Sequence, residues 1–239
     1  MAINIDTLKT RAITALIFVA VMLGGLLWNQ WSFLALFTII HFGCWYEFIK
    51  LIKKIYGENR VKYTLTGLFY ITMPICMMIN LRSGWGGFGD SKTPVDPMAT
   101  GFGNTIPILI IFSIWVNDTM AYLVGSLIGK TPFSKISPKK TWEGTIGGVI
   151  LCVVVIGFVF PQLAERFFYP FDQKQTYFIV AFICAIAGTS GDLLESKLKR
   201  MAGIKDSGSI MPGHGGFLDR FDSLLVATPF VWLYVKLFV

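Results

Sequence analysis

The stretch GTIGGVILCVVVIGFVFPQLA, residues 144–164, contains no Asp, Glu, Lys or Arg. About 20 apolar residues are enough for a helix to cross the hydrocarbon core of a membrane. Similar uncharged runs occupy residues 12–28, 63–81, 97–117 and 175–191, and residues 31–46 are uncharged apart from His41. The runs are continuously apolar and do not alternate, which argues against a transmembrane β-barrel. The sequence therefore predicts an all-α, polytopic integral membrane protein.

The composition agrees with a membrane protein. Of the 239 residues, 54% are hydrophobic and 15% are charged, whereas a soluble domain usually has ~25% charged residues. We expect one membrane domain over residues 1–239, in which residues 1–104 form N-terminal helices with few motifs and residues 105–239 form catalytic helices and cytoplasmic loops. The expected spans are residues 12–28, 31–50, 62–81, 105–128, 145–164, 175–195 and 222–239. Eight or nine spans remain alternatives to seven.

The basic residues are distributed unevenly along the chain, which has a net charge of +7. If the N-terminus is inside, the inner loops hold almost all of the lysines and arginines, and the outer loops hold only Arg82, Lys92, Arg166 and Lys174. Cytoplasmic loops carry an excess of Lys and Arg. We therefore expect a multi-pass protein of the inner, cytoplasmic membrane with residues 191–223 facing the cytoplasm.

Residues 191–223, GDLLESKLKRMAGIKDSGSIMPGHGGFLDRFDS, concentrate charge between two apolar runs. Such a stretch is costly at a membrane unless water, a metal ion or a charged substrate compensates for it. Asp192, Glu195 and Lys199 share one helix face, and the Gly at position 203 predicts the helix end. The glycines of residues 213–216 favour a backbone nest for an anion. Carboxylates amid basic groups indicate metal-assisted phosphoryl transfer, although a solvated, salt-bridged loop is the simpler alternative.

Two further polar segments lie on the predicted cytoplasmic side. Asn117 and Asp118 sit near the inner end of the fourth expected span, where an aspartate favours a polar site or an interhelical hydrogen bond. Residues 137–144, SPKKTWEG, open the fifth span; a helix N-terminus with lysines can bind phosphate, but a basic loop that only sets topology explains them equally well. Glu47, inside the second span, is more simply a hydrogen-bonded packing residue than a site residue, with a function as the alternative because intramembrane carboxylates often have one. No Walker loop, Rossmann fingerprint or Ser-His-Asp elbow is present.

The charged stretch resembles the signature of the phosphatidate cytidylyltransferases, also called CDP-diacylglycerol synthases. The matching positions are Ser196, Leu198, Lys199, Arg200, Lys205, Asp206, Gly208, Pro212, His214, Gly215, Gly216, Asp219, Arg220 and Asp222. Met211 departs mildly from the Leu, Ile or Phe that the family pattern usually shows. The segments NDTMAY and SPKKTWEG also resemble family motifs, so the resemblance covers roughly residues 115–223.

The resemblance implies the reaction of CTP with phosphatidic acid to give CDP-diacylglycerol and pyrophosphate, with Mg²⁺ as one or two bound metal ions. It also implies a homodimer in the membrane and metal-binding aspartates at Asp192 and Asp219. The expected catalytic residues are Asp192, Asp219, Lys205, His214 and Asp222. The expected substrate-binding residues are Asn117, Asp118, Ser137, Lys139, Lys140, Thr141, Glu143, Lys199, Arg200, Gly215, Gly216 and Arg220.

Three other activities remain open at this point. A CTP-dependent lipid kinase and a cytidylyltransferase for another lipid phosphate would use similar residues. An ion-coupled transporter would use Asp118 and Asp192 as coupling groups, but the chain has no internal repeat and its polar residues gather on one predicted side. No sequence feature indicates a nucleic-acid partner.

Overall fold

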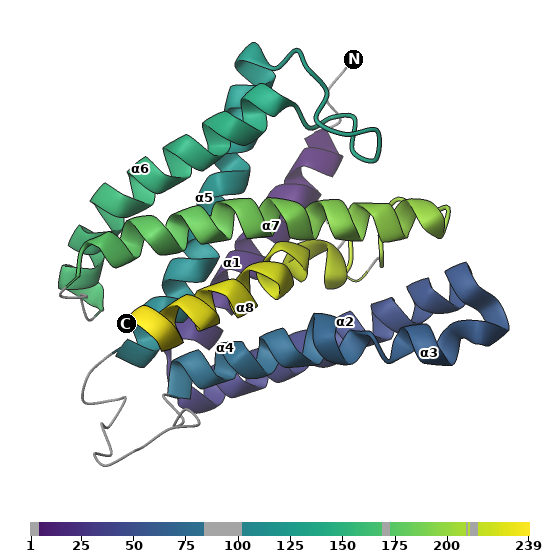
Figure 1. Ribbon diagram of the computed structural model, residues 1–239, viewed down its shortest axis with the longest axis horizontal. Coiled ribbons are helices and arrows are strands. Elements are labelled where there is room, and N and C mark those ends of the chain that lie inside the picture. Colours follow the sequence, from purple (N-terminus) through teal and green to yellow (C-terminus); the bar gives the residue numbers. More distant parts are fainter. Residues whose placement is uncertain (1–4, 84–101, 169–172, 209, 211–214) are drawn as a thin grey trace. The chain divides into compact units, whose positions relative to one another are not determined.

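In the computed structural model of the chain, the described residues are 5–83, 102–168, 173–208, 210 and 215–239. Their regular elements are helices (Figure 1). The α-helices are α1 (Ile5–Leu27), α2 (Gln30–Tyr56), α3 (Arg60–Thr64), α4 (Met73–Ser83), α5 (Phe102–Ile128), α6 (Trp142–Phe167), α7 (Gln175–Met201) and α8 (Leu218–Phe238). A 3-10 turn, η1 (Gly57–Asn59), and a π-helical segment, η2 (Leu68–Thr72), lie between α2 and α4. The predicted all-α class is confirmed.

Five helical segments among the described residues are long and apolar enough to cross a membrane. They are Gln30–Thr64, Thr105–Ile128, Trp142–Phe167, Gln175–Met201 and Leu218–Phe238. The other two expected spans correspond to shorter apolar helices, Ala12–Leu27 and Leu68–Ser83. The predicted count of seven is therefore not confirmed.

The stretch between the second and third expected spans is mostly helical and not an open loop. α2 continues past the expected end at residue 50 to Tyr56, because Lys53 and Lys54 can occupy its last turn, where cations favour the helix dipole. Gly57 then takes a positive φ of 55° and ends the helix. The expected third span starts in α3. It is interrupted by the π-helical segment η2, just before Pro74. Proline is a common cause of an irregular helix.

The chain divides into two compact units. Unit 1 comprises Met1–Thr72 and Glu195–Asp222, and unit 2 comprises Met73–Leu194 and Ser223–Val239. Helices α7 and α8 each contribute residues to both units. In unit 1, α2 buries a stripe of apolar residues with helical spacing, and Glu47 is buried in the same helix.

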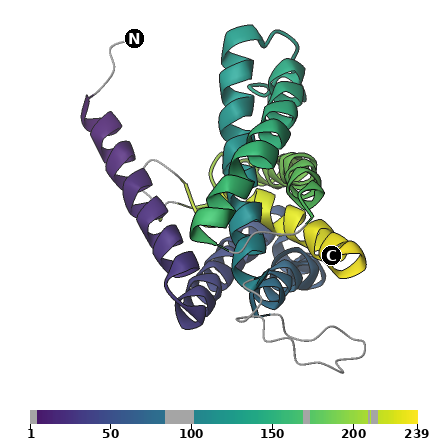
Figure 2. The same cartoon turned by 90° about the vertical axis from the view of Figure 1, so that its left-hand side faces the viewer.

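Unit 2 contains a closely packed pair of helices, α5 and α6, which lie side by side in Figure 2. Small residues permit the close approach: a Cβ atom added to Gly148 would lie 2.7 Å from the Cβ atom of Ala121, and one added to Gly147 would lie 2.6 Å from Val124. Small residues at helix contacts are typical of membrane proteins. This packing fixes the N-terminal end of α6 beside the last turns of α5.

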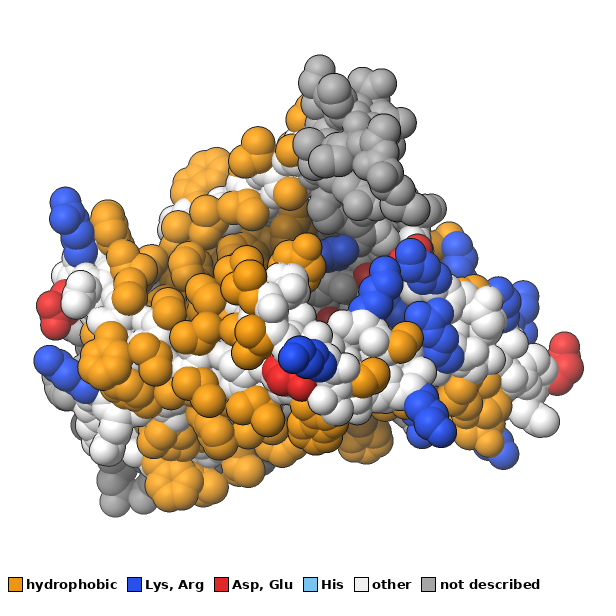
Figure 3. All heavy atoms as spheres, turned by 90° about the horizontal axis from the view of Figure 1, so that it is seen from above, with side chains coloured by type: hydrophobic (Ala, Val, Ile, Leu, Met, Phe, Trp, Pro, Cys, Tyr) orange, Lys and Arg blue, Asp and Glu red, His pale blue; other side chains and the backbone are white. Residues whose placement is uncertain are grey.

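Much of the surface is hydrophobic. Broad areas of hydrophobic side chains are visible in Figure 3, in which Lys and Arg gather separately. Leu16, Phe69, Phe158 and Leu237 are among the large apolar side chains that are more than half exposed. Soluble monomers rarely expose contiguous apolar areas of this kind, so this surface suits contact with lipid.

Candidate active site

The loop that precedes α6 is held in shape by residues of α6 itself. Thr141 caps the helix by accepting the Gly144 N–H at 3.1 Å. The Glu143 carboxylate accepts the Thr131 hydroxyl at 2.8 Å and the backbone N–H groups of Lys130 and Thr131 at 3.2 Å. The loop backbone therefore folds back onto the start of α6, and the lysine pair just before Thr141 is fixed there.

A pocket of about 390 Å³ opens between this loop and helices α5 and α7 in unit 2. Its lining residues are Asn117, Asp118, Ala121, Tyr122, Gly125, Ser126, Lys139, Lys140, Thr141, Gly144, Thr145, Thr189 and Asp192. Lys140 forms an ion pair with Asp192. Asn117 is only 3% exposed, and its side-chain oxygen accepts no hydrogen bond from the described residues. A buried amide oxygen without a donor is costly, so the pocket is suited to a polar ligand.

Six of the predicted site residues therefore surround one pocket. They are Asn117, Asp118, Lys139, Lys140, Thr141 and Asp192. Ser137 and Glu143 do not line it, and their substrate-binding roles stay predictions; the Glu143 carboxylate holds the loop. Asp118 is exposed in the structure.

A second polar centre lies in unit 1, around the C-terminal end of α7. Lys199 forms ion pairs with Glu195, one turn earlier, and with Asp219 in the first turn of α8. Its Nζ atom donates to Asp219 Oδ1 at 2.6 Å. Asp219 Oδ2 accepts the backbone N–H groups of Ser207 at 2.9 Å and of Gly216 at 2.8 Å. The Asp219 carboxylate is thus fixed by three donors.

The end of α7 and the start of α8 depend on glycine backbones. α7 ends as predicted near residues 202–203, because Gly203 takes a φ of 64° and the N–H groups of Gly203 and Ile204 bond back to Arg200 and Lys199 at 3.0 Å. Gly215 has a φ of 83° and packs against the Asp219 carboxylate. Gly216, also predicted as a site residue, donates its N–H to Asp219.

Glu47 enters the same centre from α2. Its side chain is 1% exposed and accepts the backbone N–H groups of Phe217 and Leu218, both at 2.9 Å. The Ser207 hydroxyl donates to it at 2.6 Å. The expectation of a hydrogen-bonded packing residue at Glu47 is therefore confirmed, and its hydrogen bonds hold the beginning of α8.

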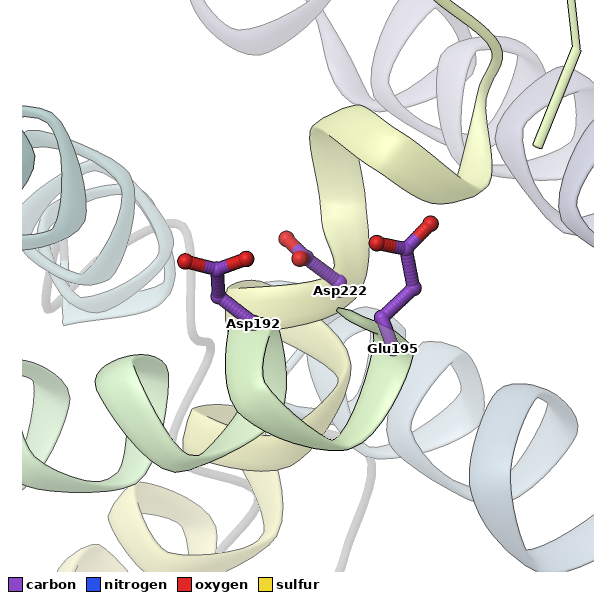
Figure 4. A group of neighbouring side chains, drawn as sticks. All are labelled: Asp192, Glu195 and Asp222. Atoms are coloured by element: carbon purple, nitrogen blue, oxygen red, sulfur yellow. The ribbon is translucent and has the colours of Figure 1, made fainter. Parts of the chain in front are cut away.

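The carboxylates of α7 and α8 form an acidic cluster that could bind a metal ion. Glu195 and Asp222 each offer an oxygen atom, and these two atoms lie within 4.8 Å of each other. Figure 4 shows both side chains together with Asp192, which precedes Glu195 by one turn on α7. Glu195 is fully buried, and apart from its ion pair with Lys199 its oxygens accept no hydrogen bond from the described residues. Buried carboxylate oxygens with unused lone pairs fit a hard cation such as Mg²⁺.

The remaining predicted residues lie at the surface or outside the described part of the chain. Arg200, Lys205 and Arg220 are exposed, and the guanidinium of Arg200 contacts the Ile204 carbonyl at 3.5 Å. His214 lies outside the described residues. Their catalytic and substrate-binding roles stay predictions.

Comparison with known sequences decides the family. The sequence profile of the cytidylyltransferase family matches residues 95–238. This chain belongs to the cytidylyltransferase family. Both polar centres contain residues of the matched region, which includes every predicted site residue.

Three relatives are named phosphatidate cytidylyltransferase. This chain is 33% identical to a phosphatidate cytidylyltransferase of Rickettsia typhi over 92% of its length and 88% of the relative. It is 34% identical to one of Bacillus subtilis, over 79% of this chain and 63% of the relative. It is 36% identical to phosphatidate cytidylyltransferase 4, chloroplastic, of Arabidopsis thaliana over 72% of this chain. The chain spans less than half of that plant relative, 45% of its length.

Three residues of this cytidylyltransferase's polar centres were absent from the predicted site. Glu195 follows Asp192 by three residues and precedes Lys199 by four, so its place on the same helix face was a usable signal. Glu47 carried a weaker signal as a carboxylate within an apolar run. Ser207 carried none, since its role depends on a fold that brings α2 to the loop after α7.

Proposed function

We propose that this cytidylyltransferase transfers the cytidylyl group of CTP to phosphatidic acid and releases pyrophosphate. The names of its relatives support phosphatidate as the lipid. The single observation that carries the proposal is the continuity of a lysine-bearing polar pocket with an apolar groove in unit 2, because a lipid phosphate needs both.

The groove lies between α6 and α7 and has a volume of about 350 Å³. It shares Thr145 and Thr189 with the polar pocket. Its other lining residues are Phe133, Trp142, Ile146, Val149, Ile150, Ile186, Ser190 and Leu193. Ile146 and Ile150 are 53% and 57% exposed, so the groove is open on the outside of the protein. An acyl chain can lie in this groove while the headgroup reaches Lys139 and Lys140.

In the proposed reaction, a phosphatidate oxygen attacks the α-phosphorus of CTP. The new P–O bond forms as the bond from the α-phosphorus to the bridging oxygen breaks, and that electron pair leaves with pyrophosphate. The phosphate nucleophile is already ionised at neutral pH, so no general base is required. Lys139 and Lys140 neutralise phosphate charge in the pocket, and Asn117 offers a hydrogen-bond acceptor to the nucleotide.

A divalent metal, proposed here as one or two Mg²⁺ ions, fits the carboxylates of α7 and α8. Asp192 and Asp219 are the proposed ligands, and Glu195 and Asp222 join them as candidates because of the geometry described above. When bound, Mg²⁺ neutralises triphosphate charge and stabilises the departing pyrophosphate. Lys199 keeps Glu195 and Asp219 in place through its two ion pairs.

The finer points of location and assembly are also proposals. The distribution of Lys and Arg supports an inner-membrane protein whose site faces the cytoplasm, where CTP is available. The family resemblance supports a homodimer. A single membrane domain and seven spans stay predictions for the whole chain.

Replacing Ile150 with Trp is expected to obstruct the acyl groove. The larger ring fills space beside Thr189, so the KM for long-chain phosphatidate should rise by about 10-fold, a change of about 1.4 kcal/mol in binding free energy. The KM for CTP should stay within about 2-fold of the wild-type value, because the substitution does not affect nucleotide binding. Both constants follow from initial rates in detergent micelles of fixed lipid mole fraction.

Val154→Trp is the matched control for this variant. Val154 is 45% exposed on the same helix but lines neither the groove nor the pocket. It should leave both KM values unchanged. An equal rise in the two variants, or a rise in the KM for CTP alone, would place the acyl chain elsewhere.

The proposed function is tested by substrate dependence in the purified protein. Incorporation of cytidine label into lipid should require CTP, phosphatidic acid and a divalent metal together. Label entering another lipid phosphate in preference to phosphatidic acid would indicate the second cytidylyltransferase activity. Ion flux in liposomes without CTP, combined with no labelled lipid, would favour the transporter.

A further inference from the structure

The contacts of Glu47 identify a function for the N-terminal helices. The family profile begins at residue 95, and the predicted site residues all follow it. Glu47 lies well before this region on α2, yet its carboxylate reaches the loop after α7 and the start of α8. A carboxylate within a membrane-embedded helix is costly and usually has a functional reason.

Both Glu47 oxygens are engaged at the N-terminus of α8. Oε1 accepts the Phe217 N–H and Oε2 accepts the Leu218 N–H, each at 2.9 Å. The first N–H groups of a helix have no partner within the helix, and a negative charge there also interacts favourably with the helix dipole. Glu47 therefore supplies from α2 the cap that α8 lacks in its own sequence.

The Ser207 hydroxyl connects Glu47 to Asp219. It lies 2.6 Å from Glu47 Oε2 and 3.0 Å from Asp219 Oδ2. A hydroxyl has a single proton, so the shorter contact assigns that proton to Glu47. The backbone N–H of the same Ser207 donates to Asp219 at 2.9 Å. Glu47 thus fixes Ser207, and Ser207 fixes the Asp219 carboxylate.

The surrounding residues leave little freedom at this junction. A Cβ atom on Gly208 or Gly216 would overlap the Glu47 carboxylate, so a larger residue at either position would displace this carboxylate from its hydrogen bonds. Gly43, one turn before Glu47, makes room for the Phe217 ring: an added Cβ atom would lie 2.5 Å from it. α2, the loop after α7 and the start of α8 are therefore packed as one rigid junction within unit 1.

We propose that Glu47 is a positioning residue that holds Asp219 in its reactive placement through Ser207 and the N-terminus of α8. It is 1% exposed and so does not touch substrate. The proposal rests on the proposed function for the reaction that Asp219 serves. It assigns to the helices before the family-matched region a direct part in shaping the site.

Glu47→Gln is the first test. The Gln amide has the same size as the Glu carboxylate, but an NH₂ group replaces one of the two acceptor oxygens. This NH₂ group then faces a hydrogen-bond donor and cannot accept its hydrogen bond. We expect kcat to fall by about 100-fold, as small displacements of a reacting group can cause, with little change in either KM. Amide hydrogen exchange of residues 215–222 should become faster. Mn²⁺ binding, followed by electron paramagnetic resonance, should weaken.

Ser207 variants keep the test decisive if Glu47→Gln folds poorly. Ser207→Ala removes only the bridge and should lower kcat in the same way, whereas Ser207→Thr retains the hydroxyl and should restore it. The Glu47→Gln/Ser207→Ala double variant should be no worse than Glu47→Gln alone, because the two residues act in series. Additive losses would overturn the proposed connection.

Thr72→Val is the matched structural control. It removes two side-chain contacts of α2, with His41 at 3.0 Å and Trp45 at 2.9 Å, that do not reach α8. It should lower thermal stability but leave kcat, Mn²⁺ binding and exchange at residues 215–222 unchanged. If it lowers kcat as much as Glu47→Gln does, Glu47 has only a general packing role. If wild type lacks cytidylyl transfer, the proposed function fails, while exchange and Mn²⁺ binding still decide the positioning role.

Discussion

The Asp219→Asn protein is expected to lose at least ~100-fold of its cytidylyl transfer rate, about 2.7 kcal/mol of transition-state stabilisation, while remaining folded. The remaining amide oxygen can still accept the N–H groups of Ser207 and Gly216, so the start of α8 keeps its hydrogen bonds. The variant loses one negative charge, and its amide nitrogen faces Lys199, which donates to Asp219 in the wild type. The proposed metal ligand and the partner of Lys199 are therefore lost together.

The rate of Asp219→Asn is measured as labelled CTP incorporated into phosphatidate in detergent. Asp206→Asn is its control, because it makes the same substitution at an exposed carboxylate of the loop between α7 and α8 and should keep the wild-type rate. Thermal unfolding of both variants shows whether they are folded. Near-normal transfer by a folded Asp219→Asn protein would exclude a metal-binding or charge-positioning role for this residue.

The cytidylyl transfer rate of the Asp192→Asn protein is expected to fall by ~100-fold or more. The reasons differ from those for Asp219→Asn. Asp192 lines the polar pocket and forms the ion pair with Lys140. If it also binds Mg²⁺, its loss should raise the Mg²⁺ concentration needed for half-maximal rate. The ion pair is half-buried, with its side chains 29% and 30% exposed. A pair that solvent still reaches contributes about 0–1 kcal/mol, which is too little for a loss of this size.

Lys140→Gln distinguishes the two roles considered for Asp192, as the ion-pair partner of Lys140 and as a proposed metal ligand. This variant breaks the same ion pair but leaves the carboxylate, so it should raise the KM for CTP or phosphatidate and keep the Mg²⁺ dependence of wild type. The double variant should resemble Asp192→Asn if the carboxylate has the larger role. Identical losses and identical Mg²⁺ dependence in the two single variants would reduce Asp192 to a partner of Lys140.

Much of the fold and part of the candidate site follow from local sequence features. The uncharged runs give the helices from α5 to α8 with ends close to those predicted, because burial in lipid requires a continuous helix. The end of α7 follows from Gly203, and the position of Glu143 in the first turn of α6 follows from the residues around it. These features depend on neighbours within one or two helical turns.

The contacts between distant segments could not be predicted in the same way. Glu47 and Leu218 are far apart in sequence, and nothing in either local pattern specifies their hydrogen bond. Glu143 illustrates a related difficulty: the sequence predicts a substrate contact, which stays a prediction, but it does not predict that the carboxylate also accepts the Thr131 hydroxyl. Tertiary packing decides which carboxylates remain available for a ligand.

The fate of the CTP phosphates tests the central claim most directly. Purified protein in phosphatidate-containing micelles receives CTP labelled either at the α-phosphate or at the γ-phosphate, with Mg²⁺. The account predicts that α-label enters the lipid, that γ-label appears only in pyrophosphate, and that one pyrophosphate is released for each labelled lipid. Entry of γ-label into the lipid with release of CDP would contradict it and identify a lipid kinase.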